Sequence, residues 1–270
     1  MSDVLKELVD LLALERLEEN LFRGRSQDLG WGQVFGGQVL GQALSAAAQT
    51  VPSERDVHSL HGYFLRPGDV NRPIIYDVDR IRDGRSFTTR RVVAIQKGSP
   101  IFNLAASFQA DEPGFNHQDL APEQEGPQGL PSHLELTRKW IHRVPESVRA
   151  WAEADRPIET RPVAPGDPMD PRPGPASRAI WYRAAGPLPD GQAIHRYLLA
   201  YASDFHFLVT ALRPHGVSWL SPGMQVASLD HAMWFHRPVR MDQWLLFDME
   251  SPSASGARGM ARGRIFDQRG

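Results

Sequence analysis

The chain has 270 residues, of which 41% are hydrophobic and 23% charged, a composition typical of a globular protein with a substantial buried core. Its 30 basic and 32 acidic side chains give a formal charge of -2, so the charge balance does not support binding to nucleic acid or to an anionic membrane. Because the sequence has no cysteine, disulfides, thiolate metal sites and a cysteine nucleophile are excluded.

The first 22 residues predict an amphipathic helix, with apolar side chains at Leu5, Leu8, Val9 and Leu12. Acidic residues throughout this segment argue against a secretory signal peptide. No run approaches the roughly 18 apolar residues typical of a membrane span. From the absence of these signals we expect a cytoplasmic protein.

A second helix is predicted over residues 34–51, "VFGGQVLGQALSAAAQTV", where glycine and alanine leave little side-chain bulk. Since each helical glycine costs about 1 kcal/mol relative to alanine, we expect other elements to surround this helix closely. The hairpin turns Asp83-Gly84 and Lys97-Gly98 separate strands of an antiparallel meander. Four runs rich in β-branched and aromatic residues predict its strands: 57–65, 73–84, 86–98 and 100–109.

Proline indicates a connector in the middle of the chain. Twelve of the 22 prolines fall between Pro113 and Pro175, where they interrupt helices and remove backbone donors. Within this connector, "HLELTRKWIHRV" and "ESVRAWAEA" predict short helices draped over the domains. The predicted organisation is an N-terminal domain over 1–110, a connector over 111–176 and a C-terminal domain over 177–270.

The two predicted domains repeat one another. The segment "FLRPGDVNRPIIYDVDRIRDG" from Phe64 aligns without a gap with "FHRPVRMDQWLLFDMESPSAS" from Phe235. After a one-residue shift, "QKG" at Gln96 matches "QRG" at Gln268, but only the first repeat continues through another strand to Gln109. We therefore expect the second half to lack its last strand. We also expect either that the natural chain continues past Gly270 or that the sequence covers only an ordered part.

One carboxylate, Asp204, stands inside the most apolar run of the chain, "HRYLLAYASDFHFLVTAL". A desolvated carboxylate is more basic and can take a proton from water, so Asp204 is a candidate general base. Alternatively, Asp204 caps a helix at a break in the run. If the run is helical, His206 points away from Asp204. The sequence has no G-x-S-x-G elbow, H-E-x-x-H zinc motif or phosphate loop.

Several motifs resemble acyl-CoA thioesterase II over the whole chain. They are "LFRGRSQDLGWGQVFGGQVLGQAL", "VHSLHGYFLRPGD", "YASDFHFLVTALRPHG" and "LDHAMWFHRP". The resemblance implies an α+β double hotdog fold, in which each of two antiparallel sheets wraps a central helix. It also implies hydrolysis of fatty acyl-CoA to free acid and CoA without metal or bound cofactor. Matched by motif, Asp204 in "YASD" and Ser228 in "QVASLDH" are the implied catalytic residues, with a glutamine on the missing final strand.

Three further residues are candidates for substrate binding. His58 lies near the expected acyl site, although a structural core histidine suits the same position. Gly36 and Gly37 permit close backbone approach, and N–H groups at a helix N-terminus would stabilise the developing oxyanion. Several aromatic residues are candidates for the lining of an acyl tunnel, although the same residues suit an ordinary core: Phe205, Phe207, Trp219, Trp234 and Phe235.

Some alternatives remain open from the sequence. Ser228 is compatible with a structural role, as a strand hydroxyl bonded to the backbone, as well as with a catalytic role. The sequence is also compatible with a non-catalytic acyl-CoA-binding protein or with a hotdog enoyl-CoA hydratase. A hydratase would need a histidine paired with an acid. Association into a homo-oligomer through the outer faces of the sheets is a further open alternative. The sequence does not single out the arginines that would meet the phosphates of CoA.

Overall fold

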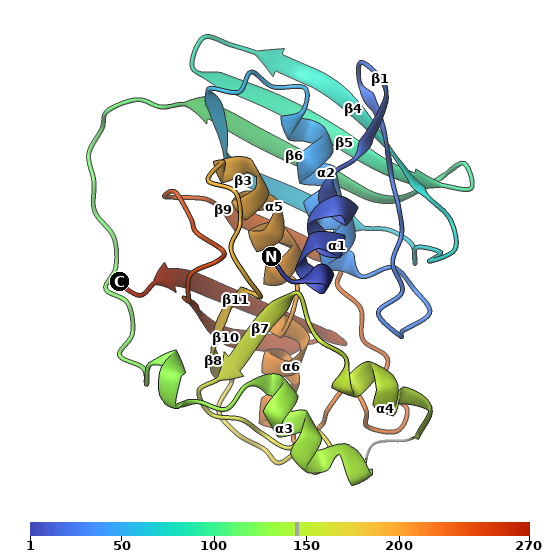
Figure 1. Ribbon diagram of the computed structural model, residues 1–270, viewed down its shortest axis with the longest axis vertical. Helices are drawn as coiled ribbons and strands as arrows, with labels where there is room; N and C mark the ends of the chain where they lie inside the picture. The colour runs from blue at the N-terminus through green and yellow to red at the C-terminus, as the bar shows by residue number, and fades with distance from the viewer. Residues whose placement is uncertain (144–145) are drawn as a thin grey trace.

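The structure is a computed structural model that describes residues 1–143 and 146–270. Two antiparallel sheets lie on either side of a layer of helices, and the long segment that follows the first sheet runs around the outside of the molecule (Figure 1). No helix in the described part of the chain is long and apolar enough to cross a bilayer.

The first sheet has seven strands in the order β1-β2-β4-β5-β6-β3-β9. Six come from the first half of the chain, and β9 is added from the second half by pairing with β3. The strands are β1 (Glu15–Glu18), β2 (Leu21–Gly24), β3 (Arg55–Phe64), β4 (Ile74–Asp83), β5 (Phe87–Gln96), β6 (Ser99–Ala110) and β9 (Asp230–Trp234).

The second sheet has four strands in the order β11-β10-β8-β7. They are β7 (Ile158–Pro162), β8 (Ser177–Ala184), β10 (Leu245–Ser255) and β11 (Arg258–Asp267). The helices are α1 (Asp3–Leu12), α2 (Gly36–Ala48), α3 (His133–Trp140), α4 (Glu146–Glu153), α5 (Gln192–Ser203) and α6 (Phe207–Leu212). Short 3-10 turns cover Pro127–Gly129, Ile141–Arg143 and Arg213–His215.

Helix α2 is the glycine- and alanine-rich helix that the sequence predicts to be closely surrounded by other elements. Every residue from 37 to 47 is buried, because the strands of the first sheet cover one side and α5 packs against the other. The small residues are necessary for this contact, since a Cβ atom added to Gly37 would lie 2.2 Å from the carbonyl oxygen of Tyr201. The two central helices therefore touch backbone to backbone, which places the N-terminus of α2 beside the C-terminus of α5.

The internal repeat is confirmed in the register of the strands. In the first half β4 pairs with β5, and a bulge interrupts their register between Asp79 and Arg82. In the second half β10 pairs with β11, and a bulge lies between Glu250 and Ser253. The two bulges are as far apart in the sequence as Phe64 and Phe235. The repeated sequence therefore specifies the bulge as well as the strands.

Three expectations about the elements need correction. The N-terminal helix ends at Leu12, and the rest of the segment forms β1 and β2. The strands after α2 do not form a simple meander, because β3 returns beside β6 on the far side of β4 and β5. The connector contains β7, a fourth strand of the second sheet that its prolines did not suggest. The predicted helices of the connector are present as α3 and α4.

The halves differ at one edge. Strand β6 pairs with both β5 and β3, which closes the first half. The equivalents of β5 and β3 are β11 and β9, and in the described chain β11 pairs only with β10, while β9 pairs only with β3. On β5 every second residue is buried, whereas no residue of β11 is buried. The boundaries predicted for the domains stay a prediction.

Candidate active site

Asp204 lies where the apolar run breaks. Helix α5 ends at Ser203, Asp204 is its C-terminal cap residue, and His206 adopts a left-handed conformation with φ of 77° before α6 begins. The side chain of Asp204 is only 6% exposed. The expected break is therefore present, but the contacts described for this carboxylate are to side chains of another segment and not to backbone N–H groups of α6.

The two oxygens of Asp204 have different surroundings. The Ser228 hydroxyl donates a hydrogen bond to Oδ1 over 3.1 Å, and Nδ1 of His231 lies 3.6 Å from the same oxygen. The other oxygen, Oδ2, faces α2, where a Cβ atom on Gly36 would lie 2.6 Å away from it. Protein side chains thus hold one oxygen, and the other points toward the N-terminus of a buried helix.

Ser228 belongs to the irregular segment that precedes β9. It lies two residues before the strand begins at Asp230, and it is half-buried. The neighbouring Leu229 carbonyl accepts a hydrogen bond from the Phe64 N–H, so the pairing of β9 with β3 continues up to this point. That pairing fixes the segment against the first sheet and brings the Ser228 hydroxyl to Asp204.

His231 is a residue of this site that the sequence analysis missed. It is the second residue of β9, and its side chain is 5% exposed. The sequence signal was its place at the end of "QVASLDH", the motif that supplied Ser228. Its contact with Asp204 depends on the tertiary approach of β9 to α5, which local patterns do not reveal.

The N-terminus of α2 presents backbone donors next to Asp204. The N–H groups of Gln38 and Val39 bond to the Phe35 carbonyl, so the N–H groups of Gly36 and Gly37 precede the first bonds of the helix. In any α-helix such groups have no partner within the helix, and they carry its partial positive charge. This arrangement can stabilise a negative oxygen that develops close to Oδ2 of Asp204.

Aromatic side chains gather around the start of α2, which Oδ2 of Asp204 faces. The rings of Phe35 and Phe205 stack with centroids 4.2 Å apart, and Tyr201 contacts Phe35 edge-on. Phe64 lies against Gly36. The outcome for the five aromatic residues singled out in the sequence is mixed, because Phe205, Phe207 and Phe235 pack on the core, whereas Trp219 and Trp234 are exposed.

His58 lies on β3, and its side chain contacts residues of β6 and β5 in the same sheet. Its Nε2 atom is 2.8 Å from the Ser107 hydroxyl, and its ring meets Phe87 edge-on. Burial lowers the pKa of His58 below the usual histidine value. None of these contacts is with Asp204, and a role for His58 in substrate binding stays a prediction.

Cationic groups surround the turn that follows Asp204. Burial, together with the positive charges of Arg178 and His133, lowers the pKa of His206 well below its usual value. Burial and the nearby Arg213 also lower the pKa of Arg178 to about 10. His206 is consequently neutral near pH 7, and the positive charge next to the site comes from arginine.

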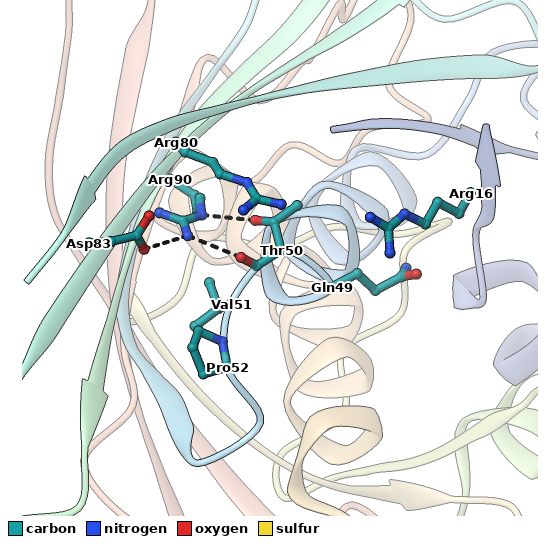
Figure 2. A pocket seen from close by; sticks show the side chains of 8 residues that line it. All are labelled: Arg16, Gln49, Thr50, Val51, Pro52, Arg80, Asp83 and Arg90. Atoms are coloured by element: carbon teal, nitrogen blue, oxygen red, sulfur yellow. Dashed lines mark hydrogen bonds and ion pairs between the residues drawn. The ribbon is translucent and has the colours of Figure 1, made fainter. Parts of the chain in front are cut away.

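Two surface cavities in the described chain lie away from Asp204. The first, of about 350 Å³, is at the C-terminal end of α2, where Arg90 bonds to Thr50 and pairs with Asp83 (Figure 2). Helix α2 separates it from Gly36 by roughly 18 Å. The second cavity, of about 650 Å³, is lined by residues near the start of α5, including Arg183 and Arg240. Neither cavity contacts the Asp204 carboxylate.

Comparisons with known proteins identify relatives along the whole chain. Residues 150–270 match the family described as acyl-CoA thioesterase, and residues 26–109 match its N-terminal domain family. The chain is 45% identical to acyl-CoA thioesterase 2 of Haemophilus influenzae over 270 residues, which cover 100% of this chain and 94% of the relative. It is 41% identical to human acyl-coenzyme A thioesterase 8, with 96% of this chain and 83% of the relative covered.

Among solved structures, an acyl-CoA thioesterase II from Mycobacterium marinum has a TM-score of 0.77 and 42% sequence identity. The match covers 97% of this chain and 91% of that one. A hot dog fold protein from Alicyclobacillus acidocaldarius has a TM-score of 0.76 at 19% identity, and it bears on the fold alone. The expected α+β double hotdog, with two antiparallel sheets and long central helices, is confirmed.

Proposed function

Since the chain belongs to the acyl-CoA thioesterase II family, we propose that it hydrolyses fatty acyl-CoA with a water molecule that Asp204 activates. The protein is an acyl-CoA thioesterase, so the proposal concerns how the reaction occurs and on which acyl groups. The observation that carries it is the asymmetric carboxylate, with Oδ1 held by Ser228 and Oδ2 directed at the start of α2.

In this mechanism Oδ2 accepts a proton from water while the water oxygen attacks the thioester carbonyl. A positioned base contributes about 10² to 10⁴ in rate. The side chain of Asp204 is only 6% exposed, so the surrounding protein keeps bulk water from competing for the carboxylate. When the tetrahedral intermediate collapses, the carbon–sulfur bond breaks and CoA leaves as the thiol, with the proton that Asp204 received.

The backbone of α2 suits the developing oxyanion. The N–H groups of Gly36 and Gly37 stand at the positive end of the helix, and Gly36 is the residue that touches Oδ2 of Asp204. Removal of one such donor typically costs about 3 to 4 kcal/mol of transition-state stabilisation. The water and the carbonyl oxygen therefore have separate partners, at the end of α5 and at the start of α2.

Ser228 steadies the carboxylate in this proposal. Its hydroxyl donates to Oδ1, the oxygen that does not take the proton from water, so the bond orients the base without competing with the reaction. The substrate class is supported by the aromatic surroundings of Asp204, since these side chains favour an apolar acyl chain over a polar one.

We also propose that a strand pairs between β11 and β9 in the functional protein and carries the glutamine that the family resemblance implies. The unequal edges of the two halves support this strand. It would give β9 and β11 the shared neighbour that β6 gives to β3 and β5. Thioester turnover by this chain should increase when such a strand with its glutamine is appended, and it should not increase when that glutamine is replaced by alanine.

The alternative hydratase chemistry has one observation in its favour, the pairing of His231 with Asp204. The ring of His231 is buried, however, and its other nitrogen faces Ser203, so neither nitrogen is presented to a substrate.

A quenched-flow intact-mass experiment tests the proposed hydrolysis. During turnover of a long-chain acyl-CoA, no acyl adduct of the protein should accumulate; an adduct on Asp204 would show that this residue is a nucleophile instead of a base.

A further inference from the structure

His231 bridges two consecutive residues at the end of α5. Its Nε2 atom lies 3.0 Å from the hydroxyl of Ser203, and its Nδ1 atom lies 3.6 Å from Oδ1 of Asp204. Strand alternation explains this placement, because His231 and Met233 are the buried residues of β9 and both point toward α5. The imidazole therefore lies behind the carboxylate, on the side away from Oδ2.

The order Ser203, His231, Asp204 resembles that of a nucleophilic triad, but the surroundings exclude that chemistry for the serine. Ser203 is 2% exposed, and its hydroxyl also contacts the Ala200 carbonyl at 2.8 Å and the Met233 sulfur at 3.2 Å. A nucleophile has to reach the carbonyl carbon of its substrate, and no thioester can approach a hydroxyl enclosed in this way. Of these three side chains, Asp204 is the one with an oxygen, Oδ2, directed at the start of α2.

The proton between His231 and Asp204 can be assigned from hydrogen-bonding rules. An ionised carboxylate oxygen has lone pairs only, so it accepts hydrogen bonds and donates none. If Nδ1 carried the lone pair, it would face the lone pairs of a carboxylate oxygen. With a hydrogen on Nδ1, the ring donates toward Oδ1 of the carboxylate. Its Nε2 atom lies 3.0 Å from the oxygen of the Ser203 hydroxyl, whose own hydrogen is donated to the Ala200 carbonyl. The separation of 3.6 Å is slightly longer than a hydrogen bond, and such catalytic contacts tighten when substrate binds.

We propose that His231 is a positioning residue, which holds the Asp204 carboxylate through Nδ1 so that Oδ2 remains the oxygen that accepts a proton from water. This inference rests on the proposed role of Asp204 as base. Ser228 and His231 approach Oδ1 from the segment that includes β9, whereas Asp204 comes from the end of α5. Two donors on one oxygen fix the plane of the carboxylate, which one hydroxyl alone leaves free to rotate.

Two conservative variants separate the two ring nitrogens. The amide nitrogen of asparagine occupies about the place of Nδ1, and that of glutamine occupies about the place of Nε2. If His231 acts through Asp204, His231→Asn should keep kcat for a long-chain acyl-CoA within about threefold of wild type. His231→Gln should lower kcat about tenfold or more, a part of the ~10² to 10⁴ due to a positioned base, with KM little changed. His236→Gln, at an exposed histidine, is the matched control and should change neither.

The opposite order, with glutamine more active than asparagine, would overturn the proposal, because it would assign the role to the Ser203 contact. Equal losses in both variants would overturn it as well. A double-mutant cycle with Asp204→Asn covers the case in which one variant folds poorly: adding His231→Gln to Asp204→Asn should cause no further loss, and independent losses contradict the proposal. Wild-type turnover by Asp204→Asn itself would instead refute the proposed base.

Discussion

The Ser228 hydroxyl donates a hydrogen bond to Oδ1 of Asp204 over 3.1 Å, across 24 residues of sequence. This single contact joins the end of a central helix to the segment that enters the first sheet as β9. It converts an isolated carboxylate in an apolar run into an oriented one, with Oδ2 left to face the start of α2.

Removal of the Ser228 hydroxyl should weaken turnover more than binding. For Ser228→Ala we expect kcat to fall about tenfold, because Asp204 loses one of the contacts that fix its plane, while KM changes little. Ser228→Thr keeps the hydroxyl and should retain most of the activity. Steady-state release of free thiol from acyl-CoA measures both variants. Equal losses for alanine and threonine would indicate a role in packing instead.

Gly36 should tolerate no side chain. A Cβ atom there would lie 2.6 Å from Oδ2 of Asp204, closer than real contacts allow, so Gly36→Ala forces the carboxylate away from the start of α2. Displacement of a catalytic group by about 1 Å costs on the order of 10²-fold in rate, and we expect a loss of kcat of that size. Gly166→Ala, at an exposed glycine with open space around it, is the matched control. Similar kcat values for the two variants would contradict the placement of Oδ2.

Gly37 differs from its neighbour in what it touches. A Cβ atom on Gly37 would lie 2.2 Å from the Tyr201 carbonyl oxygen, so Gly37→Ala should push α2 and α5 apart. Overpacking of this kind costs about 1 to 3 kcal/mol of unfolding free energy. Urea unfolding followed by circular dichroism measures the loss. An unchanged midpoint would mean that the two central helices do not approach as closely as described.

Much of this fold could be predicted from local patterns. The small residues of α2 indicated a surrounded helix, and the Lys97-Gly98 turn is present with both residues in the left-handed region. β1 was missed because all four of its residues are exposed, so only its pairing with the adjacent strand β2 identifies it as a strand. β7 was missed for a related reason, since its strand identity comes from pairing with β8.

The site was predictable only in part. Asp204 was conspicuous as a charge among apolar residues, and the motif supplied Ser228. His231 was not predicted, because its two contacts reach back 27 and 28 residues to the end of α5. The left-handed turn at His206 was also missed, since the apolar run continues through it without a glycine. In both cases the chain position gives no sign of what packing brings together.

The half-buried His206 should make the protein sensitive to acid. Its pKa is lowered in the folded state, so the unfolded chain binds a proton below about pH 6.5 that the folded chain does not. Unfolding free energy should therefore fall as pH decreases from about 6.5 toward the folded-state pKa, by up to about 1.4 kcal/mol per pH unit from this group.

Asparagine tolerates a left-handed conformation and does not titrate, so His206→Asn should reduce this acid sensitivity. Urea titrations of both proteins at pH 7.5 and pH 5.5 measure the difference. An identical pH dependence would show that His206 is not protected from protonation in the fold.

The most direct test of the account is the turnover of Asp204→Asn, which keeps the shape of the side chain and removes its capacity to accept a proton. With a saturating long-chain acyl-CoA, we predict a loss of about 10² to 10⁴ in kcat, with the unfolding midpoint close to that of wild type. Asp230→Asn, at the exposed first residue of β9, should turn over at the wild-type rate. Equal kcat for Asp204→Asn and wild type would contradict the assignment of Asp204 as the base.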